Sequence, residues 1–399
     1  MKEKFLALEI GPDGTDGLFF SVDEDRSIIL EKFVEGAALA KFLKSPARRF
    51  AHALGGSAPL PGARRRVIAA AHPSLATTIP IPLRLPREQA NAGTKITLDE
   101  FENLIARAFA KIFNNCRAEA AKRLGAGELD TVLVGASAAR FKMDGAPLRS
   151  PVGSAGKEIS LILELTFAAR RVFEALAPLF ASPEIFYFAE APQARLRALS
   201  RVKKPPVGLV SPGDGKGAPD GASPGDGAAL YLLMRPEGDY DVLYREKLKW
   251  SPADFVRAVA AAFSVDAPTA GDLYRLYRRG EMSPAAARAF AKITEPPRAA
   301  FEEELGRKKV KGTIYLDVPH PPAGIQIAGI SVEEPPVGGL LAELGFSLSR
   351  GGAYRKIMND ERRRQAAFRP LLSFIEAYFD RSDSPINRRL RHRFHWLAG

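Results

Sequence analysis

The feature that most constrains this chain is a strand–turn–strand pattern near the start of each half. Residues 4–33 contain three strand-like runs, "KFLALEI", "GLFFSV" and "RSIILEKF". Residues 228–244, "AALYLLMRPEGDYDVLY", again place a turn rich in Gly, Pro and Asp between apolar runs. Short apolar runs bounded by such turn residues are typical of strands. The recurrence predicts an internally duplicated α/β protein.

The first turn has two interpretations. It lies in "LALEIGPDGTDGLFF", residues 6–20. Gly and Asp favour a tight turn with positive φ, which suits either an ordinary hairpin or a backbone cradle for phosphate. Pro12 removes one backbone donor from such a cradle. Asp13 and Asp16 place negative charge in the turn, which would repel an anion.

Composition narrows the class of protein. The chain has 399 residues, 46% of them hydrophobic, enough for the cores of two or three domains. No apolar run is long enough to span a membrane, and "MKEKFLALEIGPDG" lacks the apolar core of a signal peptide. The lone cysteine, Cys116, argues against disulfides and fits a reducing cytoplasm. The five histidines form no spaced cluster, so we expect no metal site.

The clearest predicted helix covers residues 97–124. Thr97 and Glu100 have the spacing of a capping box, and Ile96 with Phe101 can close a hydrophobic staple around it. Apolar residues then recur at helical spacing, which predicts one buried stripe that ends at Cys116. We therefore expect Cys116 to be a core residue, with a reactive thiol as the alternative.

Residues 203–227, "KKPPVGLVSPGDGKGAPDGASPGDG", differ in character from the rest. They contain "SPGDG" twice and, proline aside, no apolar side chain larger than alanine after Val210. This composition favours a flexible surface loop. A phosphate loop is the alternative, but the GxxxxGK[ST] spacing is missing.

The last residues are strongly basic. From Arg350 onward there are twelve Arg or Lys and five Asp or Glu. The end, "SPINRRLRHRFHWLAG", predicts an amphipathic helix capped at Ser384. Its apolar stripe, its basic face and an interfacial Trp suit an anionic membrane surface. Two alternatives are docking of the stripe on the chain's own body and binding of nucleic acid. The residues expected at the membrane are Ile386, Arg388, Arg389, Leu390, Arg391, Arg393, Phe394, Trp396 and Leu397.

The middle of the chain carries the most specific pattern. It contains "IPIPL", "ITLDEFENLIARAFAKI" and "LDTVLVGASAARFKMDGAPLRSPVGSAGKEISLILELTF" in this order. This series resembles FtsA, the actin homologue of bacterial cell division, and in particular its inserted subdomain. The "KMDG…PVG…G" run, which ends at Gly156, is the most specific piece. The pilus-assembly actin homologue PilM has the same plan and is the alternative within the superfamily.

The resemblance implies an α/β fold: a duplicated actin-like (ribonuclease-H-like) ATPase fold with an FtsA-type inserted subdomain. It implies a first large subdomain formed by residues 1–75 and 173–202, with the insertion at 76–172. A Gly/Pro-rich flexible loop at 203–227, a second actin-like domain at 228–380 and a basic amphipathic tail at 381–399 are expected to follow.

The resemblance also places a nucleotide site. In actin-like ATPases, two glycine-containing hairpins cradle the phosphates, and an acidic residue on each orients magnesium or water. On the first hairpin, Glu9 stands where the family usually has Asp. Gly11 and Gly14 keep the turn, and Thr15 offers a hydroxyl.

The other segments of that site match less well. The second hairpin is expected at "MRPEGDY", where Met234 replaces the acid and Gly238 remains. The ribose-side motif falls on "AGDLY", residues 270–274, without its usual Glu and Lys. The adenosine loop falls on "AGIS", where only Gly329 and Ser331 remain. Each lost contact costs about 1–3 kcal/mol, so we expect little or no ATPase activity. ATP and magnesium are expected only if the altered site still works.

The resemblance and the basic tail together predict a scaffold protein. We do not expect it to hold a cofactor firmly. It would tether an FtsZ-like tubulin homologue to the anionic inner face of the cell membrane, and self-association into filaments is a further expectation. The chain would be cytoplasmic and peripheral on that membrane, and we expect no nucleic-acid partner. The alternatives are an active actin-like ATPase and a PilM-like pilus-assembly adaptor.

Overall fold

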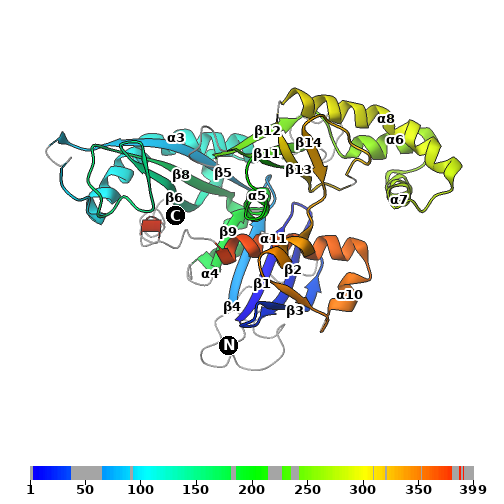
Figure 1. The fold of residues 1–399 in the computed structure, drawn as a ribbon, viewed down its shortest axis with the longest axis horizontal. Coiled ribbons are helices and arrows are strands. Elements are labelled where there is room, and N and C mark those ends of the chain that lie inside the picture. The colour runs from blue at the N-terminus through cyan, green and yellow to red at the C-terminus, as the bar shows by residue number, and fades with distance from the viewer. Residues whose placement is uncertain are drawn as a thin grey trace. The chain divides into compact units, whose positions relative to one another are not determined.

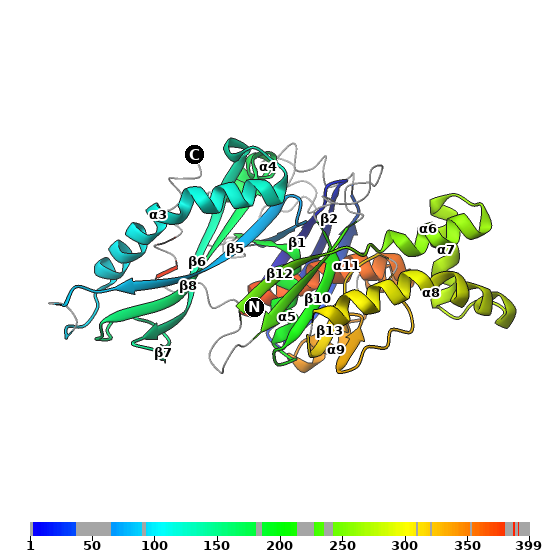
Figure 2. The same cartoon turned by 90° about the horizontal axis from the view of Figure 1, so that it is seen from above.

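The computed structural model describes residues 3–36, 65–89, 93–180, 186–213, 227–234, 242–308, 310–319, 321–351, 353–379, 386–387 and 390. The chain divides into two compact units. Unit 1 comprises residues 1–198 and 337–399, and unit 2 comprises residues 199–336. Figures 1 and 2 show the elements of each unit, which are described separately below.

Unit 1 is built on a six-stranded sheet in the order β15-β3-β2-β1-β4-β9. β1 pairs antiparallel with β2, which pairs antiparallel with β3, whereas β1, β4 and β9 run parallel. The first three strands are therefore a meander, as the sequence predicts for residues 4–33. The strands are β1 (Glu3–Ile10), β2 (Thr15–Val22), β3 (Ser27–Val34), β4 (Arg65–Ala71), β9 (Phe186–Glu190) and β15 (Ser347–Ser349).

Helices pack on both faces of this sheet, because successive side chains of a buried strand point to opposite sides. Leu6 and Leu8 of β1 share a core with residues of α4 (Arg170–Phe180). Phe5 and Phe20 instead meet Phe374 of α11, with ring centroids 5.0 and 4.9 Å apart. The other helices that the structure describes in this region are α5 (Ala191–Ser200), α9 (Val337–Glu343), α10 (Tyr354–Met358) and α11 (Glu361–Phe379).

The packing of α11 corrects an expectation. We predicted that the second domain extends from residue 228 to residue 380, with this helix packed on it. In the structure, the chain returns to unit 1 at Val337, and α11 lies against β1, β2 and β4. The helical pattern of α11 correctly indicates an apolar face, but periodicity does not tell which sheet that face covers.

A second sheet in unit 1 forms the inserted subdomain, in the order β5-β8-β6-β7. The helix α3 lies along this sheet, and their apolar side chains form one core (Figure 2). The sheet spans Ala76 to Ala169, within the segment 76–172 expected for the insertion. Its elements are β5 (Ala76–Pro86), α3 (Leu98–Leu124), the 3-10 turn η2 (Glu128–Asp130), β6 (Thr131–Met143), β7 (Ala146–Leu148) and β8 (Glu158–Ala169).

The start of α3 agrees with the prediction in part. The Thr97 hydroxyl accepts a hydrogen bond from the Glu100 backbone N–H at 3.2 Å, as a capping box requires. The Glu100 carboxylate, however, does not return to the Thr97 backbone but binds Arg87. Ile96 and Phe101 are both buried in the core of the subdomain. Cys116 is buried there too, which confirms that it is a core residue.

Unit 2 repeats the strand order of unit 1. Its five-stranded sheet has the order β12-β11-β10-β13-β14, with β10, β11 and β12 antiparallel and β10, β13 and β14 parallel. Strand for strand this matches β3-β2-β1-β4-β9, so the predicted duplication is present. The strands are β10 (Val207–Pro212), β11 (Ala228–Met234), β12 (Val242–Leu248), β13 (Gly312–Leu316) and β14 (Ile330–Glu333).

Three helices of unit 2 share one core with its sheet. They bury aromatic residues such as Phe255, Tyr274 and Phe301 beside Trp250. The helices are α6 (Ala253–Phe263), α7 (Ala267–Arg278) and α8 (Pro284–Arg307). Among the helices that the structure describes in either unit, none is long and apolar enough to cross a lipid bilayer.

Candidate functional site

The first hairpin forms where the sequence predicts it. β1 and β2 remain paired up to Ile10 and Thr15, and the Gly11 N–H donates to the Gly14 carbonyl at 2.7 Å. A Cβ on Gly11 would lie 3.1 Å from that oxygen, so the close turn favours glycine. The turn lies at the carboxyl ends of the parallel strands β1 and β4, the edge at which open α/β sheets bind ligands.

The acidic residue of this hairpin is already paired. Arg195, on α5, donates from its guanidinium to Glu9, and the two form an ion pair. The Arg195 side chain is 3% exposed and the Glu9 side chain 17%. An arginine of the chain itself thus compensates the charge that a cation would otherwise neutralise. Glu9 Oε2 is buried and has no hydrogen-bond partner among the described residues.

The two aspartates of the turn differ from each other. Asp13 is exposed, as an ordinary turn residue would be. Asp16 accepts a hydrogen bond from the Gly36 backbone N–H at 2.8 Å, so its carboxylate is bound at the end of β3. The expectation that both aspartates repel an anion at the turn stays a prediction, because a hydrogen bond from a neutral N–H group does not cancel the charge of a carboxylate. Thr15 is buried at the start of β2.

A second arginine of α5 also meets a buried acid. Arg197 forms an ion pair with Glu164 of β8, whose other oxygen lies 3.4 Å from the Ser137 hydroxyl. Although burial favours the neutral guanidine, the charges of Glu164 and Glu376 raise the pKa of Arg197. The helix α5 thus neutralises one acid at the hairpin and another in the inserted subdomain. We predicted a role for neither arginine, although two charges within the short apolar helix "APQARLRAL" were an available signal.

The second hairpin lies elsewhere than predicted. β10 is the counterpart of β1 and β11 that of β2, so the matching turn is residues 213–227. The Gly213 N–H donates to the Gly227 carbonyl at 2.7 Å, the same closure that Gly11 and Gly14 make. The segment 203–227 is therefore not a loop throughout, because it contains β10, a central strand of the sheet. Residues 214–226 lie outside the described part.

This register changes the residue that corresponds to Glu9. Ser211 is the penultimate residue of β10 and pairs with Ala229, as Glu9 pairs with Asp16. Met234, which we had aligned with the acid, is the last residue of β11 and pairs with Val242 of β12. Its turn joins the next pair of strands, and Gly238 in that turn lies outside the described residues.

The predicted adenosine loop falls at the wrong edge of the sheet. Gly329 precedes β14, and its carbonyl accepts from the Gly312 N–H at the start of β13. Gly329 and Ser331 thus lie near the amino ends of the parallel strands, whereas the hairpin 213–227 lies at the carboxyl end of β10. The Ser331 hydroxyl donates to Glu333 at 2.8 Å. These two residues therefore do not join the hairpin in one site.

The segment expected near ribose is part of the core. Ala270, Gly271 and Tyr274 are buried residues of α7. The Tyr274 hydroxyl donates to the Pro321 carbonyl at 3.2 Å, and burial raises the pKa of this phenol. In the described residues, no group of three His, Cys, Asp or Glu side chains is placed to hold a metal ion.

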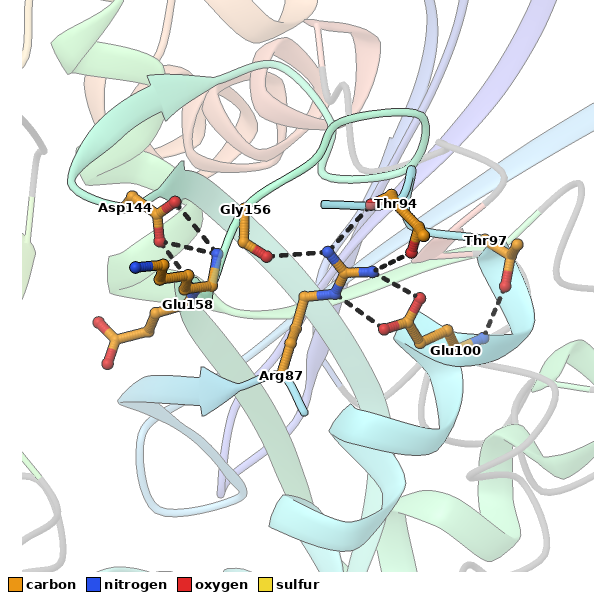
Figure 3. Close-up of polar contacts among 8 residues, drawn as sticks. Arg87, Thr94, Thr97, Glu100, Asp144, Gly156 and Glu158 are labelled. Carbon is orange, nitrogen blue, oxygen red and sulfur yellow. Dashed lines mark hydrogen bonds and ion pairs between the residues drawn. The ribbon is translucent and has the colours of Figure 1, made fainter. Parts of the chain in front are cut away.

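The motif that ends at Gly156 has a structural role (Figure 3). Arg87, at the end of β5, binds both oxygens of Glu100 at 2.8 and 3.0 Å and the Gly156 carbonyl at 2.8 Å. The Asp144 carboxylate accepts from the backbone N–H groups of Lys157 and Glu158. A Cβ on Gly156 would lie 2.3 Å from the Met143 sulfur, so only glycine fits.

The described part of the tail is docked on the inserted subdomain. Ile386 and Leu390 are 5% and 1% exposed and belong to the core that α3 and the sheet form. This is the arrangement of the docking alternative, and in it neither side chain is available to a lipid surface. The other residues of the predicted membrane face, Arg388, Arg389, Arg391, Arg393, Phe394, Trp396 and Leu397, lie outside the described side chains.

These sheets and their repeated order define an actin-like ATPase fold. No protein-family model matches the sequence, and no curated protein matches it significantly. Among solved structures, the chain is similar to one in a PilM–PilN type IV pilus biogenesis complex. The TM-score is 0.51 and the identity 16%, over 95% of this chain and 98% of that one. At this identity the likeness shows the fold and no more.

Two further structures are more distant. One is a ROK family protein from Streptococcus pneumoniae TIGR4, in complex with sucrose, with a TM-score of 0.35 and 9% identity over 94% of this chain and 99% of that one. The other is a diol dehydratase-reactivating factor in its nucleotide-free form, with a TM-score of 0.36 and 9% identity over 94% and 100%.

Proposed function

We propose that this chain is a PilM-like adaptor, a scaffold that binds a protein partner of a pilus-type assembly machine. The full-length likeness to a chain of the PilM–PilN complex carries this proposal, because it includes the inserted subdomain as well as both sheets. Our alternative interpretation of the sequence is thus better supported than the FtsA-like one.

The residues at the base of the two hairpins support the proposal of a scaffold rather than an enzyme. Glu9 is engaged by Arg195, and its counterpart in unit 2 is Ser211, a buried hydroxyl in place of an acid. Magnesium prefers carboxylate and phosphate oxygens, so both positions are poor for a metal–nucleotide complex. In this proposal the chain works through protein surfaces and not through ATP turnover.

The test is direct binding to a PilN-like protein from the same genome, measured by co-purification and by titration of the isolated partners. Binding with a defined stoichiometry supports the proposal. An ATPase assay on the same preparation should give a rate no higher than the buffer blank. Failure to bind any such partner, together with appreciable turnover, would favour the actin-like ATPase alternative.

An FtsA-like division scaffold is the second candidate. Its support is the "KMDG…PVG…G" motif, which in the structure forms the turn around Asp144 and the close packing at Gly156. This candidate has an FtsZ-like partner, attachment to the membrane and self-assembly into filaments. Fluorescent localisation separates the two: a midcell band favours division, and a polar or dispersed pattern favours the pilus-type adaptor.

A further inference from the structure

One edge of the inserted sheet carries an unusual contact. β6 pairs with β8 along most of its length, but on its other side β7 pairs only with residues 141–143. Ala138 lies in the part of β6 that β7 does not cover. Its backbone N–H donates to the Asn387 side-chain oxygen at 2.8 Å, and its carbonyl accepts from the Asn387 side-chain nitrogen at 3.3 Å.

An asparagine amide fits such an edge because it offers one donor and one acceptor on the same side, as a neighbouring strand does. An uncovered edge strand is otherwise a site for unwanted pairing. The contact joins residues 249 positions apart in the sequence, and both bonds are buried. Asn387 therefore satisfies backbone groups that another segment of chain could also satisfy.

Two apolar side chains flank this amide. Ile386 precedes Asn387, and Leu390 follows at helical spacing, so both lie close to one side of a turn. Both belong to the core cluster of α3, β5, β6 and β8. The pattern Ile-Asn-x-x-Leu thus combines two apolar anchors with one bidentate polar contact, and backbone hydrogen bonds with buried side chains are what bind a peptide at a sheet edge.

We propose that the β6 edge around Ala138 is a recognition site for an Ile-Asn-x-x-Leu segment, and that Ile386, Asn387 and Leu390 occupy it as parts of an intramolecular ligand. The segment is then a separable ligand rather than a fixed element of the fold. This inference goes beyond the adaptor function and holds whether or not a PilN-like partner binds.

The sharpest test uses the folded full-length chain. A protease site is placed in the segment 380–385, the protein is purified, and the connection is cut under native conditions. An unlabelled synthetic peptide of residues 384–399 is then added in excess, and release of the original tail is followed by mass spectrometry. We expect exchange, with a dissociation constant that a labelled peptide then measures by fluorescence anisotropy.

A matched control peptide carries Asn387→Ala. It should bind at least about tenfold more weakly, because one charge-neutral bidentate contact to a buried backbone is lost. A second control peptide carries Arg391→Ala, outside the Ile-Asn-x-x-Leu pattern, and should bind within about twofold of the original. Two results would overturn the proposal. In one, the cleaved tail is never replaced by added peptide. In the other, the cleaved chain without its tail binds the original peptide and the Asn387→Ala peptide equally well.

Discussion

Arg195 on α5 and Glu9 at the end of β1 form a largely buried ion pair between residues 186 positions apart in the sequence. In the actin-like fold, that end of the first strand is the edge where a ligand would bind. The pair gives a physical reason why the hairpin can keep its shape without a ligand: the charge of Glu9 at its base is neutralised from within unit 1.

The first prediction concerns this pair. Arg195→Met should lower the free energy of unfolding by about 3 kcal/mol, because it leaves the buried Glu9 carboxylate without its partner. Adding Glu9→Gln to that variant should recover part of the loss. Urea denaturation of the two single variants and the double variant measures the coupling. Strictly additive losses would show that the ion pair contributes nothing.

The second prediction concerns nucleotide. Isothermal titration of the full chain with ATP and magnesium should show no low-micromolar binding, because Glu9 is occupied by Arg195 and Ser211 stands at the matching position. The variant Arg195→Ala, which frees Glu9, should not restore binding, since Ser211 still lacks a carboxylate. Low-micromolar affinity in the unchanged chain would contradict this argument.

The third prediction concerns the polar cluster at Arg87 (Figure 3). Arg87→Lys keeps the charge but loses the planar fork that binds Glu100 and the Gly156 carbonyl. We expect a loss of about 2–3 kcal/mol in the free energy of unfolding. Arg84→Lys, on the exposed side of the same strand, is the matched control and should change it by less than about 0.5 kcal/mol. Equal effects of the two substitutions would exclude this role for the cluster.

The fourth prediction is a pH dependence at Cys116. Burial raises the pKa of this thiol above its ordinary value of 9.0. The folded chain therefore keeps the proton where the unfolded chain releases it, so this group's contribution to stability falls as the pH rises above 9.0. Cys116→Ser should remove that part of the alkaline decline in the free energy of unfolding.

Native Cys116 should also react slowly with a thiol reagent at pH 8, and rapid labelling of folded protein would count against its burial.

Local patterns and distant contacts were not equally predictable. The helix 98–124 follows from Thr97 and a periodic stripe, signals that lie within one turn or one face. The strand β10 was missed because its three large apolar residues, Val207, Leu209 and Val210, stand among Gly, Ser and Pro. The correct hairpin was missed with it. The two arginines in an apolar helix were a local signal of buried charge, but the pairing with Glu9 is fixed only by the packing of α5 and could not be read from the sequence. In the tail, the apolar stripe was recognised, but a stripe does not reveal whether lipid or protein covers it.

The last prediction connects the tail to lipid. Ile386 and Leu390 cannot be buried in the inserted subdomain and in a bilayer at once, so docking should compete with membrane binding. Asn387→Ala weakens docking without removing apolar or basic side chains, and we expect it to increase co-sedimentation with liposomes that contain anionic lipid. The matched control combines it with Ile386→Asp and Leu390→Asp, which should abolish the increase because no apolar stripe remains. If Asn387→Ala leaves sedimentation unchanged while hydrogen exchange shows that the Ala138 amide has become exposed, docking and lipid binding do not compete.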